Sequence, residues 1–151
     1  MIRATGCVAL GLALVVIGCD KRGSTQDTAR FRVEALDRST VNLIPSPGQL
    51  PFCLAFSASD SGVVRLLTMT GQNEAIVCDP GVPIGGVSYR IPDEDGHVRL
   101  IVVFTDQAIE AAPLASQVRE ISYKRGKVTG MDLRAPGTIT VDSIEFNPPP
   151  R

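Results

Sequence analysis

The sequence contains no tryptophan and a single histidine, and aromatic residues make up only 5% of its 151 residues. Aromatic platforms that stack on bases or sugars are therefore scarce, and a metal site built from several histidines is excluded. Fifteen Lys and Arg residues stand against sixteen Asp and Glu residues, which gives a net charge of -1. Because proteins that bind nucleic acid usually carry a basic excess, we expect no nucleic-acid partner.

The apolar run at the N-terminus is too short for a membrane-spanning helix, which needs about 20 residues. It covers residues 4–18, carries no charge and follows the basic start Met1-Ile2-Arg3. This arrangement is typical of a secretory signal peptide, which we therefore predict for residues 1–18. The alternative is an uncleaved N-terminal anchor, assisted by Lys21 and Arg22.

The end of that run, Val16-Ile17-Gly18-Cys19, resembles the bacterial lipobox. The resemblance implies a thioether-linked diacylglycerol on Cys19, cleavage before this residue and acylation of the new amino group. Several acyl chains anchor a protein almost permanently, so we predict a lipoprotein of the bacterial cell envelope, facing the periplasm or the exterior. Asp20 resembles the inner-membrane retention signal of enterobacteria, but other bacteria follow other rules. Both the inner and the outer membrane therefore remain open.

Cysteine use fits an oxidising compartment. Of the four cysteines, Cys7 falls in the signal peptide and Cys19 is the lipidation site, which leaves Cys53 and Cys78. An oxidising envelope favours a disulfide between these two, worth about 3 kcal/mol in the chain-entropy model. Two separate buried thiols are the alternative. No Cys-x-x-Cys pair is present, so neither thioredoxin-like redox chemistry nor a structural zinc site is predicted.

The rest of the chain is typical of one antiparallel β-sandwich of about seven or eight short strands with one short peripheral helix. Residues 19–29 are predicted to form a flexible tether, residues 30–146 the sandwich and residues 147–151 a Pro-rich tail. The Ser-rich stretch 57–62 is predicted to be a turn. Apolar alternation and apolar runs between Gly and Pro positions predict strands at 31–35, 41–44, 52–56, 63–70, 75–78, 87–91, 98–104 and 138–146.

Three of these elements carry finer predictions. Apolar residues on both faces of 98–104 indicate a central strand that is covered on both sides. In the last strand the apolar positions change phase between Val141 and Ile144, which predicts a bulge near Asp142-Ser143. The spacing of Leu114, Val118 and Ile121 predicts a short helix over 113–120, packed on the sheet edge.

Residues 50 to 146 also carry an ordered series of strand and turn motifs, namely LPFCLAF, SASDSG, VVRLLTM, PGVPIGGVSYRIP, DEDGHVRLIVVFTD, PLASQVRE and TITVDSIEF. The series resembles a bacterial envelope domain, the domain-of-unknown-function family 4384. The resemblance implies a β-sandwich on secreted or membrane-tethered proteins, sometimes near caspase-like peptidases or signalling proteins. That family has no established catalytic residues, so the resemblance supplies none. Phe52-Cys53 stands where the family often has a tyrosine followed by an apolar residue.

The search for reactive groups gives little. His97 is the only possible imidazole base, and neither a nucleophile nor an orienting partner can be identified for it, so we expect an exposed turn histidine. The turn before it, Asp93-Glu94-Asp95-Gly96, lacks the ligand spacing of a calcium loop and is expected to be solvated. The Gly-rich loop 80–86 and the basic turn 124–127 are likewise expected to be plain turns rather than phosphate or anionic-lipid sites. We predict no catalytic residue, metal or cofactor.

Two classes of function remain. The first is a non-catalytic binding or scaffolding module with a protein partner in the envelope, which includes docking lipoproteins of secretion-type membrane complexes. The second is a small envelope hydrolase, which would need a cleft joining His97 to Asp and Ser side chains.

Overall fold

The computed structural model describes residues 29–125 and 127–148, and these residues are mostly β-structure. The predicted signal peptide, Cys19, nearly all of the tether and the end of the Pro-rich tail lie outside them. The strands are β1 (Phe31–Ala35), β2 (Thr40–Pro45), β3 (Phe52–Ser59), β4 (Val64–Leu66), β5 (Ile76–Val77), β6 (Tyr89–Arg90), β7 (Val98–Thr105) and β8 (Ile139–Phe146). The helix is α1 (Ala111–Arg125), and two short 3-10 turns are η1 (Ile84–Gly86) and η2 (Asp93–Asp95).

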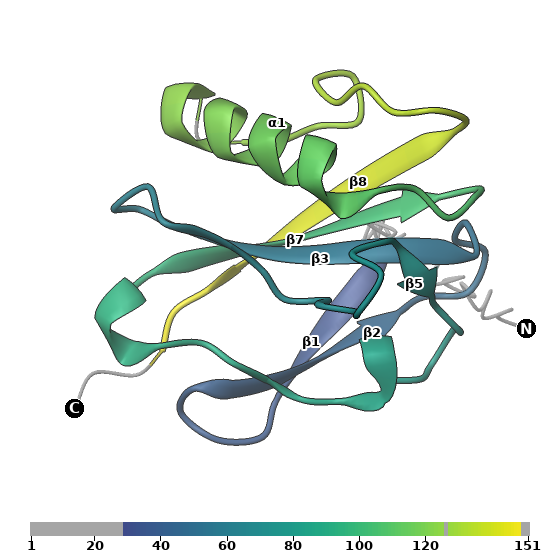
Figure 1. Ribbon diagram of the computed structural model, residues 1–151. Coiled ribbons are helices and arrows are strands. Elements are labelled where there is room, and N and C mark those ends of the chain that lie inside the picture. Colours follow the sequence, from purple (N-terminus) through teal and green to yellow (C-terminus); the bar gives the residue numbers. More distant parts are fainter. Residues whose placement is uncertain (1–28, 126, 149–151) are drawn as a thin grey trace, which may run out of the picture.

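The strands form two antiparallel sheets, which confirms the predicted all-β sandwich with one helix. The smaller sheet has the order β1-β2-β6, and the larger has the order β4-β3-β7-β8 with β5 also paired to β3. Figure 1 shows the smaller sheet on one side of the larger sheet and α1 on the other side. The larger sheet is therefore the middle layer of the molecule. None of the helices in the described residues is long and apolar enough to cross a membrane.

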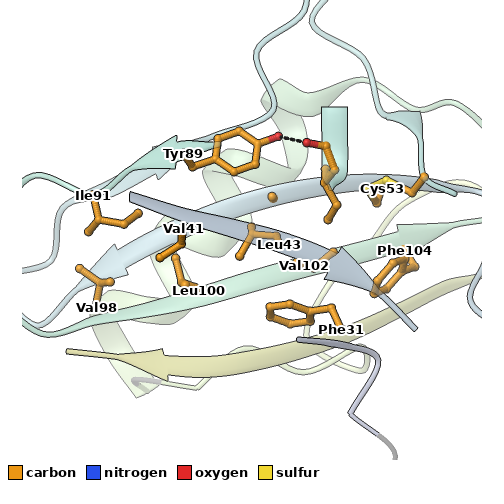
Figure 2. Close-up of a cluster of buried hydrophobic side chains, with 13 residues drawn as sticks. Phe31, Val41, Leu43, Cys53, Tyr89, Ile91, Val98, Leu100, Val102 and Phe104 are labelled. Atoms are coloured by element: carbon orange, nitrogen blue, oxygen red, sulfur yellow. Dashed lines mark hydrogen bonds between the residues drawn. A yellow bond between two sulfur atoms is a disulfide. The ribbon is translucent and has the colours of Figure 1, made fainter. Parts of the chain in front are cut away.

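Two hydrophobic cores lie on the two faces of the larger sheet. The sandwich core between the sheets contains Phe31, Val41, Leu43, Cys53, Ala55, Ile84, Tyr89, Ile91, Val98, Leu100, Val102 and Phe104 among its buried members (Figure 2). The helix-side core contains Leu54, Phe56, Ala58, Ile101, Val103, Leu114, Val118, Val128 and Leu133 among its buried members. Strands β3 and β7 contribute to both cores, which confirms that both strands are covered on both faces.

The predicted bulge in the last strand is wrong. Strand β8 pairs with β7 in an unbroken register from Val98↔Phe146 to Thr105↔Ile139. Its phase change has another cause. Ile139 and Val141 pack against the helix-side core, whereas Ile144 and Phe146 pack against the sandwich core. In a regular strand without a bulge, the first half can be covered on one face and the second half on the other. Such a strand gives the same sequence pattern as a bulge.

Several other boundaries differ from prediction. The predicted turn 57–62 is partly wrong, because Ser57, Ala58 and Ser59 continue β3 and pair with β7. Ser57 and Ser59 are buried despite their hydroxyl groups. The helix is longer than 113–120. It contacts the edge strand β4, as predicted, and also β3, and Leu114 and Val118 belong to the helix-side core together with Ile101 and Val103. Strand β4 is shorter than the predicted 63–70.

The sandwich has two distinct ends. At the near end, where the described chain begins, Phe31 pairs with Pro45 and Phe52 pairs with Thr105. The backbone amide of Gly81 donates to the carbonyl of Pro45 at 2.9 Å and ties these parts together. At the far end Val98 pairs with both Ser59 and Phe146. Helix α1 ends toward the far end in Figure 1.

Candidate functional site

The only imidazole of the chain lies at the far end, between two carboxylates. His97 immediately precedes β7, and its Nδ1 lies 3.0 Å from Oδ2 of Asp60 while its Nε2 lies 2.9 Å from Oε2 of Glu145. The second oxygen of Glu145, Oε1, accepts a hydrogen bond from Nε of Arg99 at 3.0 Å. We call Asp60, His97, Arg99 and Glu145 the far-end cluster. Sheet pairing brings them together, because Arg99 is the register partner of Glu145.

The geometry of the cluster determines what His97 can do. A neutral imidazole has one donor and one acceptor, so only the protonated ring can donate to both carboxylates at once. A general base needs a ring nitrogen within reach of the hydroxyl that it activates. Here both nitrogens contact carboxylates, and the hydroxyls of Ser59 and Ser61 bond to each other at 2.7 Å. An exposed turn histidine was expected, and the side chain of His97 is 36% exposed and contacts two carboxylates.

A polar pocket of about 240 Å³ adjoins the far-end cluster. We call it the helix-end pocket, and the residues that matter in its wall are Asp60, Ser61, Gly62, Arg99, Ser122 and Tyr123. They come from the turn after β3, from β7 and from the last part of α1. The ring of Tyr123 is 83% exposed and lies against the backbone of Gly62, because a Cβ placed on Gly62 would be 3.7 Å from Cδ2 of the ring.

One polar atom of this pocket stands out. The hydroxyl oxygen of Ser122 is enclosed and has no hydrogen-bond partner among the described residues. Enclosed polar atoms in folded proteins nearly always have a partner, either in the protein or in a bound molecule. The described residues leave the Ser122 hydroxyl without a partner, as they do the hydroxyl of Thr140 on β8. Nothing in the sequence around Ser122 distinguishes it from the other serines.

The acidic turn before His97 is held within the fold. The side chain of Asp95 is 5% exposed and accepts two hydrogen bonds from Arg65, at 2.9 Å and 3.1 Å. This bonding raises the pKa of the Arg65 guanidinium. The pair fixes the edge strand β4 to the turn η2. In the described part of the chain, no group of three or more acidic, histidine or cysteine side chains could hold a metal ion.

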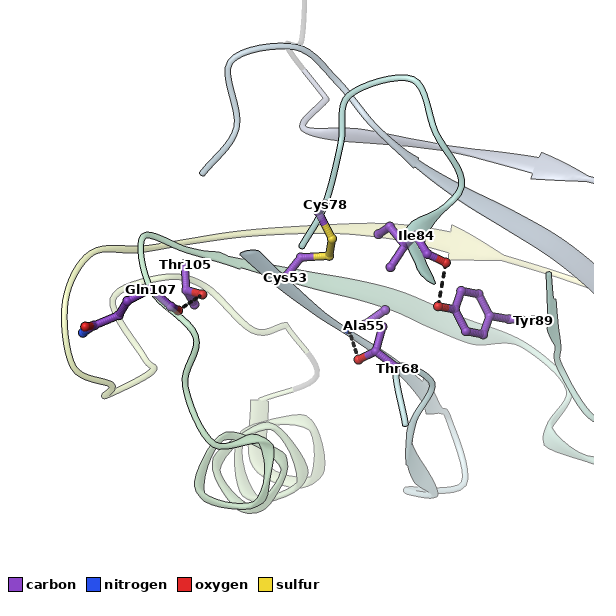
Figure 3. The surroundings of a disulfide bond; sticks show 8 residues. All are labelled: Cys53, Ala55, Thr68, Cys78, Ile84, Tyr89, Thr105 and Gln107. Atoms are coloured by element: carbon purple, nitrogen blue, oxygen red, sulfur yellow. Dashed lines mark hydrogen bonds between the residues drawn. A yellow bond between two sulfur atoms is a disulfide. The ribbon is translucent and has the colours of Figure 1, made fainter. Parts of the chain in front are cut away.

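Cys53 and Cys78, which the sequence left between a disulfide and two separate thiols, are joined in the structure (Figure 3). Their Cα atoms are 5.9 Å apart. The amide of Cys78 donates to the carbonyl of Pro51 at 2.8 Å, so the backbone on both sides of the bridge is also fixed. The disulfide holds the start of the segment 78–91, which crosses from the larger sheet to the smaller one and covers the near end of the sandwich core.

The same segment contains the Gly-rich loop 80–86. Its amides are already used within the protein, since Gly81 donates to Pro45 and Gly86 donates to the carbonyl of Pro83 at 2.8 Å. The hydroxyl of Tyr89 donates to the carbonyl of Ile84 at 2.9 Å (Figures 2 and 3). Burial raises the pKa of Tyr89 to about 12. The loop is a structural cover of the core in which Tyr89 is a fixed member.

A larger groove of about 600 Å³ runs between α1 and the loop 131–134. Gln117 crosses it, because its side chain donates to the carbonyl of Arg134 at 2.9 Å and accepts from the amide of Arg134 at 2.7 Å. Lys124 of the predicted basic turn forms an ion pair with Glu120 at 2.6 Å and lowers the pKa of that glutamate. The predicted basic turn 124–127 is wrong for Lys124 and Arg125, which belong to α1, and Gly126 lies outside the described residues.

Comparison with known proteins found no match to the chain among family models, curated proteins or solved structures. Its function is therefore argued from its own residues.

Proposed function

We propose that this chain is a lipid-anchored lipoprotein of the bacterial envelope whose β-sandwich is a non-catalytic module that binds a partner protein. The observation that carries the non-catalytic part is the position of His97, whose two ring nitrogens both contact carboxylates. An imidazole held in this way stabilises the far end of the sheet and is not aimed at a hydroxyl nucleophile. The lipobox-like Val16-Ile17-Gly18-Cys19 supports the anchor.

The arrangement of the two ends supports a display role. The described chain begins at the near end, where the hydroxyl of Ser46 donates to the carbonyl of Ala29 at 2.7 Å. A tether that leads from Cys19 to Ala29 would therefore reach the sandwich at the near end. The far-end cluster and the helix-end pocket lie at the opposite end, so an anchored molecule would present them away from the membrane.

A small envelope hydrolase is the second candidate, and one contact favours it. Asp60 and His97 lie 3.0 Å apart, which is the contact that orients the base in a Ser-His-Asp triad. This alternative requires Nε2 of His97 to leave Glu145 and to approach a serine. Turnover of an activated ester by the purified chain, abolished in His97→Ala, would favour it, whereas equal background rates would count against it. The resemblances to family 4384 and to secretion-type docking lipoproteins stay predictions.

Metabolic labelling tests the anchor. When cells that produce the chain are fed a labelled fatty acid, the wild-type protein should carry the label and fractionate with membranes. Cys19→Ala should remain an unlabelled precursor, since the thioether forms on this sulfur. Cys7→Ala is the matched control, because it removes another cysteine of the N-terminal segment and should keep the label. Normal labelling of Cys19→Ala would overturn the lipobox assignment.

Photo-cross-linking in intact cells tests the binding role. A photoreactive side chain replaces Leu36, which is 54% exposed in the hairpin between β1 and β2 at the far end. The matched control replaces Val77, which is 62% exposed on β5 near the disulfide. We expect a discrete protein adduct from position 36 and none from position 77. The absence of an adduct at position 36, or equal adducts at both positions, would contradict display of the far end.

A further inference from the structure

We propose that the helix-end pocket binds a saccharide unit, that is, a neutral ligand rich in hydroxyl groups. The inference deepens the proposed binding role and depends on it. It assigns a ligand class to a site formed by the turn after β3, by β7 and by the last part of α1. The walls of the pocket, with carboxylate, guanidinium, hydroxyl and phenol groups, match the chemistry of such a ligand.

The charged groups of the pocket already have partners within the protein. Arg99 contacts Glu145 at 3.0 Å, and Asp60 contacts His97 at 3.0 Å. An ionic ligand would have to compete with these contacts for its counter-charge. A neutral polyhydroxyl ligand would not, because it can donate to the carboxylate of Asp60 while that carboxylate keeps its contact with His97. These existing contacts therefore favour a neutral ligand, which can bind without displacing them.

The hydrogen-bonding groups of the pocket are suited to hydroxyls. The Ser122 hydroxyl has no partner among the described residues, and it can both donate and accept once its side chain rotates toward the pocket. Ser122 and Tyr123 also lie in the last turn of α1, where the final carbonyls of a helix lack partners within the helix. A sugar presents groups that donate and accept at neighbouring positions, so it can satisfy the serine, the helix carbonyls and Asp60 together.

Tyr123 supplies a flat apolar face at the rim of the pocket. The chain has only two tyrosines, and burial holds the other one, Tyr89, in the sandwich core. Tyr123 is 83% exposed, so most of its side chain is accessible to a ligand. Gly62, with φ of +88°, keeps the backbone of the turn beside the ring free of a side chain. Sugars place the C–H groups of one ring face on such an aromatic surface.

The larger groove beside α1 is a weaker candidate. Gln117 crosses it and satisfies its own amide on the backbone of Arg134, and Lys124 is paired with Glu120. None of its side-chain polar atoms is enclosed and without a partner among the described residues. The helix-end pocket also faces the end of the sandwich that an anchored molecule would present, whereas the groove follows the side of the helix.

The test is a titration of the full-length chain with the disaccharide N,N′-diacetylchitobiose, monitored by two-dimensional amide NMR. The chain is held in micelles of a detergent that has no sugar head group. We expect saturable shifts of Ser61, Gly62, Ser122 and Tyr123 with a dissociation constant on the order of 1 mM, as is usual for a small ligand of modest efficiency. Tyr123→Ala should weaken binding about tenfold, because an aromatic contact contributes roughly this factor. Tyr123→Phe keeps the ring and should retain most of the affinity.

Two controls make the outcome specific. Met131→Ala changes a side chain that is 95% exposed beside the larger groove, and it should leave the affinity unchanged. Inorganic phosphate at the same concentration should not shift the pocket residues. The proposal is overturned if the disaccharide gives no saturable shifts, if Tyr123→Ala and Ser122→Ala bind as the wild type does, or if phosphate binds instead. Each of these results can occur while lipid labelling and cross-linking succeed, so failure here is distinguishable from failure of the proposed function.

Discussion

At the scale of single residues, several polar groups of this protein are held by specific partners. Tyr89 is 7% exposed and donates to the carbonyl of Ile84, and Gly85 permits this contact because a Cβ there would lie 3.1 Å from the tyrosine oxygen. Asp95 is held by Arg65 in a bidentate pair. Asp37 accepts hydrogen bonds from the amides of Ser39 and Thr40 in the hairpin after β1, and these bonds lower its pKa.

The raised pKa of Tyr89 predicts an alkaline loss of stability. Its pKa is about 12 in the folded chain and about 10 in the unfolded chain. The neutral phenol therefore stabilises the fold fully below pH 10, and this contribution is lost as the pH rises from about 10 to 12. In urea unfolding, the free energy of unfolding of the wild type should fall by about 2 kcal/mol between about pH 10 and pH 12, beyond any fall in Tyr89→Phe. Tyr123→Phe is the control and should follow the wild type. Parallel profiles for the wild type and Tyr89→Phe would contradict this account.

At the scale of elements, sequence reasoning found every strand but misjudged where several of them end. Alternation located β1, whereas apolar runs located β2 and β7, which are largely buried. The phase change in β8 led to the wrong prediction of a bulge. Periodicity reports only which face of a strand is covered by other residues, and in β8 the covered face changes between Val141 and Ile144. The serines at the end of β3 have turn-like local preferences, but pairing with β7 outweighs them. Local sequence does not contain these tertiary contacts.

The candidate site was harder to predict than the fold. His97 and the acidic turn were recognisable as polar groups near one another in sequence. Asp60 and Glu145 lie 37 and 48 positions from His97 in the sequence, and only sheet pairing brings them to it. Ser122 and Tyr123 become pocket residues because α1 continues past the predicted end of the helix at residue 120. The signal that could have placed them is Ile121, which continues the apolar spacing of the helix.

The disulfide between Cys53 and Cys78, at the start of the segment 78–91, should contribute measurably to the free energy of unfolding. In the chain-entropy model a bridge across 25 residues stabilises the fold by about 3 kcal/mol. The double variant Cys53→Ala/Cys78→Ala should lose about this amount in urea unfolding, and reduction of the wild type should produce the same loss. Peptide mapping without reductant should recover Cys53 and Cys78 in one joined fragment. Alkylation of both cysteines in the unreduced, unfolded chain would show that they are free thiols and would contradict the bridge.

At the scale of the whole molecule, the larger sheet couples three layers. Strands β3 and β7 place alternate side chains in the sandwich core and in the helix-side core, so both cores use the same two strands. Loss of α1 would expose the helix-side face of both strands, including Leu54, Phe56, Ile101 and Val103, all of which are fully buried. Exposure of that much apolar surface is costly, so the layers should unfold together.

Leu114 offers a direct test of this coupling. It is 1% exposed and packs in the helix-side core, and Leu114→Ala should lower the free energy of unfolding by about 2–4 kcal/mol through lost burial and the cavity that remains. Ser116→Ala, on the exposed face of the same helix, is the matched control and should change stability by less than about 0.5 kcal/mol. Because the chain lacks tryptophan, near-ultraviolet circular dichroism in a Tyr123→Phe background can report Tyr89 in the sandwich core, while the signal at 222 nm reports mainly α1. In Leu114→Ala both signals should move to the same lower urea midpoint, since the central strands cannot keep one core intact after the other is lost. If the helix signal disappears at a urea concentration where the Tyr89 signal is still native, α1 is an independent cover and the three layers are not one cooperative unit.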